Sequence, residues 1–114
     1  MAIQEINWDV IEGDTWDVTI TVKDSTGTLV NFSGYNFIME VRDKEGGDFL
    51  CATATLGNGI TVTGLGALKV VLTPDQTKNF NLPRSKYQIQ SISGAGKKET
   101  LVQGWFMVKA RTIV

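Results

Sequence analysis

The chain has 114 residues, of which 42% are hydrophobic and 20% charged, as in a single soluble globular domain over residues 1–114. Eleven lysines and arginines oppose twelve aspartates and glutamates, so no overall basic field exists to attract nucleic acid or an anionic membrane. The chain has no histidine and one cysteine, which excludes histidine-based triads and metal sites, an internal disulfide and cysteine-rich zinc sites.

The first residues contain neither a basic segment nor an apolar run, so we expect no signal peptide. No apolar stretch approaches the roughly 20 residues that a membrane span needs. The single cysteine, Cys51, lies among small residues and is expected to be a buried small hydrophobe. An unpaired cysteine fits synthesis and folding in a cytoplasm.

Hydrophobic and polar residues alternate with a period of two along most of the chain, which is the pattern of half-buried β-strands. The alternation predicts strands over residues 6–10, 16–23, 29–32, 35–42, 49–55, 60–63, 68–73, 85–93 and 99–110. Clusters of Gly, Asp, Asn and Ser separate them and predict turns. Thr73 as N-cap and Pro74 at the first helical position predict one short helix near residues 74–80. The pattern predicts an antiparallel β-sandwich or barrel.

The same alternation predicts which side chains point into the core. They are Ile6, Trp8, Val10, Trp16, Val18, Ile20, Val22, Tyr35, Phe37, Met39, Val41, Leu68, Val70 and Leu72. Two of the three tryptophans are in this set, which favours core packing over an exposed platform for stacking carbohydrate.

The last predicted strand is apolar on both faces. Val102, Phe106, Val108 and Ala110 alternate on one face, and Leu101, Trp105 and Met107 on the other. Either the strand is central, covered by a second sheet on one side and by a loop or the helix on the other, or a second subunit buries one face. The candidate interface residues are Leu101, Trp105 and Met107, with the C-terminal Arg111 and Ile113 as an extension.

None of the motifs that carry chemistry is complete. Residues 94–98 lack the upstream glycine and the Ser or Thr of a phosphate-binding loop. Residues 43–48 lack the terminal glutamate and flanking helices of a calcium loop and are expected to form a solvated hairpin tip. Four carboxylates surround the first turn. These are Asp9, Glu12, Asp14 and Asp17. The sequence pattern shows no apolar pocket that would raise the pKa of one of them, as a catalytic acid requires. We therefore expect no catalytic residue, no cofactor and no metal.

Seven segments of turns and strands follow one another in a definite order. The first is a Glu-Gly-Asp-Thr turn before an alternating strand, and the last is a Gly-Trp-Phe-Met-Val strand. They are residues 12–23, 26–35, 36–46, 59–62, 72–77, 87–90 and 104–108. Their order and spacing resemble the small β-sandwich domains of tailed-bacteriophage virion proteins. The resemblance is to the N-terminal domain of phage baseplate upper proteins and to related tail or fibre-associated proteins.

The resemblance implies an all-β, antiparallel, immunoglobulin-like β-sandwich with eight or nine short strands and one short helix. It implies a non-enzymatic structural component of a virion, made in the host cytoplasm, that serves as an adaptor in the tail, baseplate or fibre attachment. Its expected partners are other virion proteins, with the chain present as a homo-oligomer or in several symmetric copies, and with neither nucleic acid nor membrane bound. The alternatives are a capsid decoration protein and a carbohydrate-binding module that uses Trp8, Trp16 and Trp105.

Overall fold

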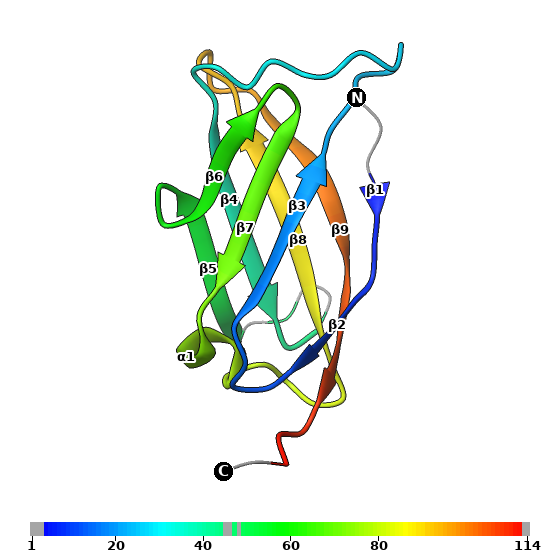
Figure 1. Ribbon diagram of the computed structural model, residues 1–114, viewed down its shortest axis with the longest axis vertical. Helices are drawn as coiled ribbons and strands as arrows, with labels where there is room; N and C mark the ends of the chain where they lie inside the picture. The colour runs from blue at the N-terminus through cyan, green and yellow to red at the C-terminus, as the bar shows by residue number, and fades with distance from the viewer. Residues whose placement is uncertain (1–3, 45–46, 48, 113–114) are drawn as a thin grey trace.

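The computed structural model describes residues 4–44, 47 and 49–112, which form nine strands and one short helix (Figure 1). The elements are β1 (Gln4–Glu5), β2 (Trp8–Ile11), β3 (Trp16–Thr21), β4 (Asn36–Arg42), β5 (Leu50–Leu56), β6 (Gly59–Gly64), β7 (Ala67–Leu72), α1 (Pro74–Thr77), β8 (Arg84–Ile92) and β9 (Lys98–Lys109). The predicted mostly-β domain with one short helix is confirmed.

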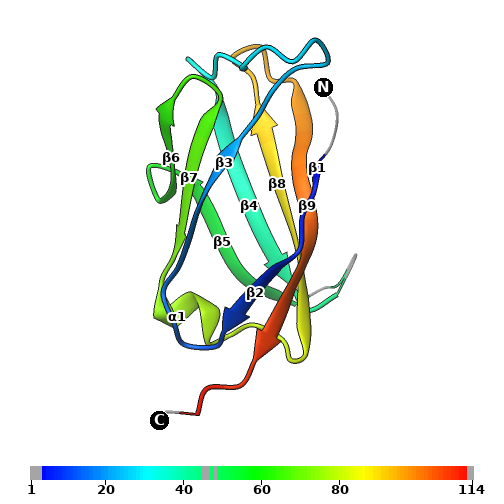
Figure 2. The same ribbon diagram turned by 45° about the vertical axis from the view of Figure 1, so that its right-hand side comes forward.

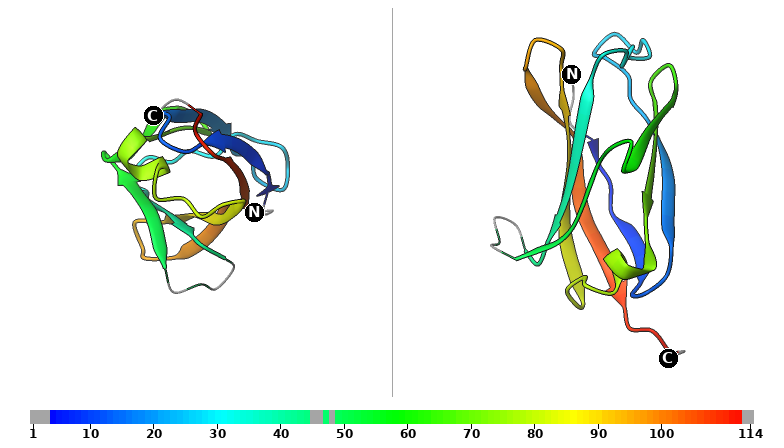
Figure 3. Two further views of the ribbon diagram at one scale, coloured as in Figure 1. Left: turned by 90° about the horizontal axis from the view of Figure 1, so that it is seen from below. Right: turned by 90° about the vertical axis from the view of Figure 1, so that its left-hand side faces the viewer.

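The strands form one strongly curled, mixed sheet in the order β1-β9-β8-β4-β5-β6-β7-β3, with β2 also paired to β9. Most pairs are antiparallel, but β1 and β2 run parallel to β9, and β5 pairs in parallel with β6. Seen end-on in Figure 3, the sheet curls around the core as a half-barrel. The predicted antiparallel immunoglobulin-like sandwich is therefore wrong, because continuous pairing from β1 to β3 makes one sheet rather than two.

Two predicted strands differ in detail from the structure. The strand expected over residues 6–10 is divided into β1 and β2, which follow β9 one after the other (Figure 2). No strand is described over residues 29–32, where Leu29 makes a single bridge to Lys23. Phe32 nevertheless enters the core and packs edge-on against Phe37, with ring centroids 5.1 Å apart. This segment contributes a side chain to the core without adding a strand.

The inward faces that the alternation predicts are confirmed. On β4, Phe37, Met39 and Val41 are at most 1% exposed, and the residues between them are half-buried. On β7 every second residue is fully buried in the same way. Trp8 and Trp16 are half-buried and pack against this cluster, which is the core placement expected for them. The described residues share one core.

An aromatic cluster joins the two ends of the curled sheet. The Trp8 ring on β2 lies 4.9 Å from the Trp16 ring on β3 and stacks on Tyr87 at 4.7 Å, measured between centroids. Phe106 on β9 contacts both tryptophans, with centroids 5.8 and 4.9 Å away. The Tyr87 hydroxyl donates a hydrogen bond to the Ile6 carbonyl, which ties the N-terminal segment to β8. Each aromatic pair adds about 0.5–1.5 kcal/mol beyond the area it buries.

Burial raises the pKa of the Tyr87 phenol above its ordinary value. The unfolded chain releases this proton near pH 10, whereas the folded protein retains it at higher pH. We therefore expect this group to leave the free energy of unfolding unchanged below about pH 10 and to lower it progressively above that pH. Urea unfolding of the protein and of the Tyr87→Phe variant between about pH 8 and pH 11 measures the effect. The variant should lose stability less steeply, and equal slopes for the two proteins would contradict the assignment.

Helix α1 begins as predicted, with Thr73 as N-cap in a capping box with Gln76, and ends at Thr77. The fully buried Thr77 links the helix to the turn between β2 and β3. Its hydroxyl donates to the Asp14 carbonyl at 2.7 Å and accepts from the Gly13 N–H at 3.0 Å. With four residues in α1, no helix of the described residues could span a bilayer.

Candidate interaction surface

A β-bulge in β9 separates Leu101 from the rest of the predicted interface. The pairing between β8 and β9 shifts between Ile89 and Gln90, which leaves Leu101 as the extra residue on β9. Leu101 and the following Val102 are 1% and 0% exposed, so both point into the core. The prediction that Leu101 faces outward is wrong, because the bulge reverses the inward and outward parity of the strand.

Beyond the bulge, β9 presents Trp105 and Met107 on the outer face of the sheet. Gly104, Phe106 and Val108 between and around them are buried, as the alternation predicts. Met107 is 41% exposed and Trp105 is half-buried. Strand β9 is central, because it pairs with β8 on one side and with β1 and β2 on the other. Its inner face contributes to the core, and its outer face carries apolar side chains that the core does not use.

Two cationic side chains from β8 lie over the Trp105 ring. The Arg84 Cζ atom is 4.3 Å and the Lys86 Nζ atom 5.1 Å from the ring centroid. Lys86 is directly opposite Trp105 in the ladder, and Arg84 is opposite Met107. Such cation–π contacts contribute about 0.5–1 kcal/mol at exposed sites. Trp105 is thus held in place by its neighbours rather than by the core.

Arg84 and Lys86 belong to none of the ion pairs found among the described residues. Those pairs are Arg42–Glu40, Lys78–Asp75, Lys97–Glu99 and Arg111–Asp14. We define the outer face of β2, β9 and β8 around Trp105 and Met107 as the outer ridge. The ridge therefore combines the half-buried Trp105 and the exposed Met107 with two cations that have no carboxylate partner within the described part of the chain.

A shallow polar hollow adjoins the outer ridge. Its volume is about 170 Å³, and Glu40, Arg42, Lys44, Lys86, Tyr87, Gln88 and Gln103 line it. Within it Arg42 forms an ion pair with Glu40 at 3.1 Å. The hollow is smaller than the roughly 300–1,000 Å³ typical of sites that enclose a small molecule. It is a recess beside the outer ridge rather than an enclosed ligand cavity.

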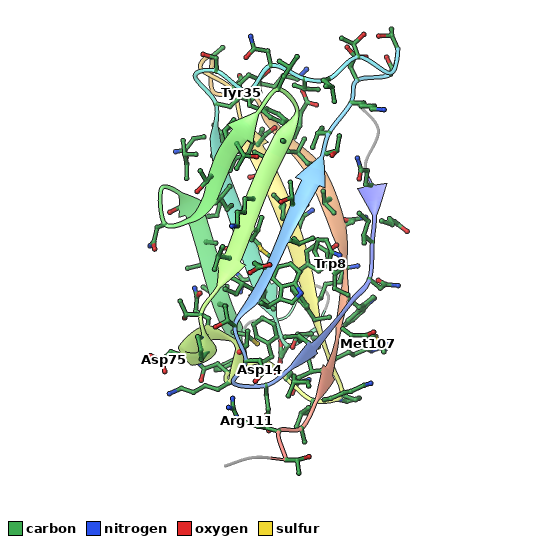
Figure 4. All side chains as sticks on the ribbon, in the orientation of Figure 1. Trp8, Asp14, Tyr35, Asp75, Met107 and Arg111 are labelled. Carbon is green, nitrogen blue, oxygen red and sulfur yellow. The ribbon has the colours of Figure 1, made fainter. Side chains whose placement is uncertain are left out.

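The C-terminal residues of the predicted interface lie apart from the outer ridge. Arg111 reaches the turn after β2, where its Nη1 atom lies 3.2 Å from the Asp14 Oδ1 atom and donates to the Gly13 carbonyl. Its backbone N–H donates to the Glu12 carboxylate at 3.3 Å. Figure 4 shows Arg111 beneath Asp14, whereas Met107 lies higher, on β9. Arg111 fastens the end of the chain to this turn, and Ile113 lies outside the described residues.

The three tryptophans do not form one platform. Trp8 and Trp16 contact each other and Phe106 on the inner side of the sheet. Trp105 has the opposite parity on β9 and lies on the outer face with Arg84 and Lys86. A sugar ring cannot stack on all three together.

Among residues 4–44, 47 and 49–112, no group of three or more Cys, Asp or Glu side chains could hold a metal ion. Cys51 is 6% exposed, as expected of a buried small hydrophobe, and burial raises the pKa of its thiol. The acidic loop is predicted over residues 43–48, and residues 45, 46 and 48 of it lie outside the described residues.

The cationic part of the outer ridge was not predicted from the sequence. In the sequence, Arg84 and Lys86 belong to no motif that carries chemistry. They alternate along β8 with the buried Ser85 and Tyr87, which indicates that they face outward. Their position over Trp105 depends on the register between β8 and β9, which local alternation does not encode.

The resemblance to phage virion domains rests on the order of turns and strands in this chain. No protein-family model matches the chain, and no curated protein has a matching sequence.

Proposed function

We propose that the protein is a non-enzymatic structural component of a tailed-phage virion, made in the host cytoplasm, that acts as an adaptor in the tail, baseplate or fibre attachment. It assembles with other virion proteins in several symmetric copies, and the outer ridge is an interface of that assembly. The observation that supports this proposal is the exposure of Trp105 and Met107 on a strand whose inner face is fully packed. The sequence resemblance to virion domains supports the assignment to a phage particle.

The composition of the outer ridge is typical of an interface. Trp, Met and Arg are enriched in protein–protein interfaces, and Trp and Arg dominate their binding energy. Trp105 is already oriented by Arg84 and Lys86, so little side-chain freedom remains to be lost when a partner binds. The surrounding ladder of β8 and β9 is a rigid support, with six residue pairs in continuous register from Arg84–Met107 to Ile89–Val102.

Incorporation into particles of the phage that encodes the chain tests the proposal. We expect Trp105→Ala to lower the copies per purified particle about tenfold or more, because central tryptophans contribute 2 kcal/mol or more to interfaces. Leu65→Ala is the matched control, since Leu65 is 57% exposed on the turn between β6 and β7. Circular dichroism should show both variants folded. Normal incorporation of Trp105→Ala, or absence of the protein from particles, would overturn the proposal.

Two other roles are distinguished from the adaptor by further experiments. Gold-labelled antibody over the head would favour a capsid decoration protein, and label at the tail tip or fibres would favour the adaptor. The polar hollow supports a carbohydrate-binding module as the second candidate, because Gln88, Gln103 and Arg42 line it together with Lys86, which lies over the Trp105 ring. Saturable quenching of tryptophan fluorescence by a host surface glycan, lost in Trp105→Ala, would support that role.

A further inference from the structure

The register across three strands sorts the charges of the outer ridge by sign. Met107 pairs with Asp9 of β2 on one side and with Arg84 of β8 on the other. All three residues are exposed, and their neighbours along each strand are more buried. A row across the sheet therefore runs from an acid, through an apolar side chain, to a base.

The two neighbouring rows each carry one charged end of this order. Trp105 pairs with Lys86 on the β8 side. On the other side its backbone N–H donates to the Asn7 side-chain oxygen at 2.9 Å. Gln103 pairs with Glu5 of β1 on one side and with Gln88 of β8, a neutral residue, on the other. Other charged groups that face this surface are Lys109 at the end of β9, Lys44 in the adjoining hollow and the Arg42–Glu40 pair on β4. The carboxylates of Glu5 and Asp9 thus lie on the β1 and β2 side of Trp105 and Met107, and the cations of Arg84 and Lys86 lie on the β8 side.

We propose that a second copy of this chain covers the outer ridge, in a face-to-face dimer whose two-fold axis runs parallel to β9. This inference rests on the proposed function, in which the outer ridge is an interface. A rotation of 180° about that axis places the β8 strand of one copy over the β2 strand of the other. Arg84 then faces Asp9 of the partner subunit, and the reciprocal pair forms on the other side of the axis. Trp105 and Met107 meet their own counterparts in the middle.

The sign of the charges selects this axis over the other face-to-face arrangement. A two-fold axis that crosses β9 at a right angle within the interface would place β8 over β8. Arg84 and Lys86 would then face the same cations of the second copy, and juxtaposed like charges disfavour association. With the axis parallel to β9, Arg84 faces Asp9 of the partner subunit and Lys86 faces the partner's Asn7, so neither of these two cations meets a cation.

Charge reversal tests the dimer directly, by light scattering and sedimentation equilibrium over a wide range of protein concentration. We expect the wild-type protein to dimerise, and Arg84→Asp or Asp9→Arg to weaken the dimer about tenfold or more. The double variant Arg84→Asp with Asp9→Arg restores the pairs with reversed sign and should return to within about threefold of wild type. Lys69→Asp is the control, because Lys69 is exposed on β7 and should leave the dimer unchanged.

Each outcome decides a separate part of the inference. A wild-type protein that stays monomeric at every concentration overturns the dimer. A dimer that the double variant fails to restore overturns the proposed axis. A monomer that still loses its place in the particle on Trp105→Ala would overturn the dimer and leave the virion role supported, with a different protein covering the outer ridge. A dimer that never joins a particle would support the dimer and overturn the virion role.

Discussion

Replacing Phe106 with alanine is expected to lower the free energy of unfolding by about 3–5 kcal/mol, as deletion of a buried phenyl ring does in other cores. Phe106 is fully buried, and its ring lies 4.9 Å from Trp16, 5.0 Å from Phe80 and 5.1 Å from Tyr87. It touches residues from both ends of the curled sheet, so the cavity would open where the sheet ends are joined. A domain has about 5–15 kcal/mol of stability in total, so this loss is a substantial fraction of it.

Urea unfolding followed by circular dichroism and tryptophan fluorescence measures this loss. Phe49→Ala is the matched control, because it removes the same ring from a side chain that is 59% exposed. The control should stay within about 0.5 kcal/mol of the wild-type protein. If the two phenylalanine variants lost the same stability, the aromatic cluster would not be the centre of the core.

Gly104→Ala is expected to cost about 1–3 kcal/mol, because the site has no room for a β-carbon. Gly104 is buried in β9, where the segment between β1 and β2 passes closest. A β-carbon at this position would lie 2.0 Å from the Ile6 carbonyl oxygen and 3.0 Å from the Asn7 side chain. The N-terminal segment would have to move away from β9, which would also break the hydrogen bond from Tyr87 to Ile6.

Urea unfolding gives the total effect of Gly104→Ala, and hydrogen exchange locates it. The Ile6 amide, which donates to the Gln103 carbonyl at 3.0 Å, should exchange faster than in the wild-type protein. Gly64→Ala in β6 is the control, since nothing lies within 4 Å of its would-be β-carbon. Unchanged protection of the Ile6 amide, together with wild-type stability, would show that the backbone is not this close to β9.

Strand β9 separates folding from association within one segment. Phe106 and Val108 point inward and contribute to the core, whereas Trp105 and Met107 point outward and are available to a partner. Because adjacent residues of a strand face opposite sides, a substitution on one side leaves the other nearly unchanged. The stability of Phe106→Ala and the association of Trp105→Ala can therefore be measured as independent effects.

Local pattern determined most of the elements and the inward faces. Alternation predicted Phe37, Met39 and Val41 as core residues, and the Thr73–Pro74 pair predicted the start of α1. It also placed Trp105 and Met107 on the face of the last strand opposite Phe106 and Val108. These features depend on backbone geometry and side-chain direction within a few residues, which the sequence encodes directly.

The tertiary structure alone decided the single mixed sheet, the bulge at Leu101 and the position of Arg84 over Trp105. Each depends on which distant strand is the partner and in which register it pairs. Parallel pairing of β1 and β2 with β9 joins residues almost a hundred positions apart, as between Glu5 and Gln103. One extra residue reverses which side chains face the core, and only the partner strand reveals where that residue lies.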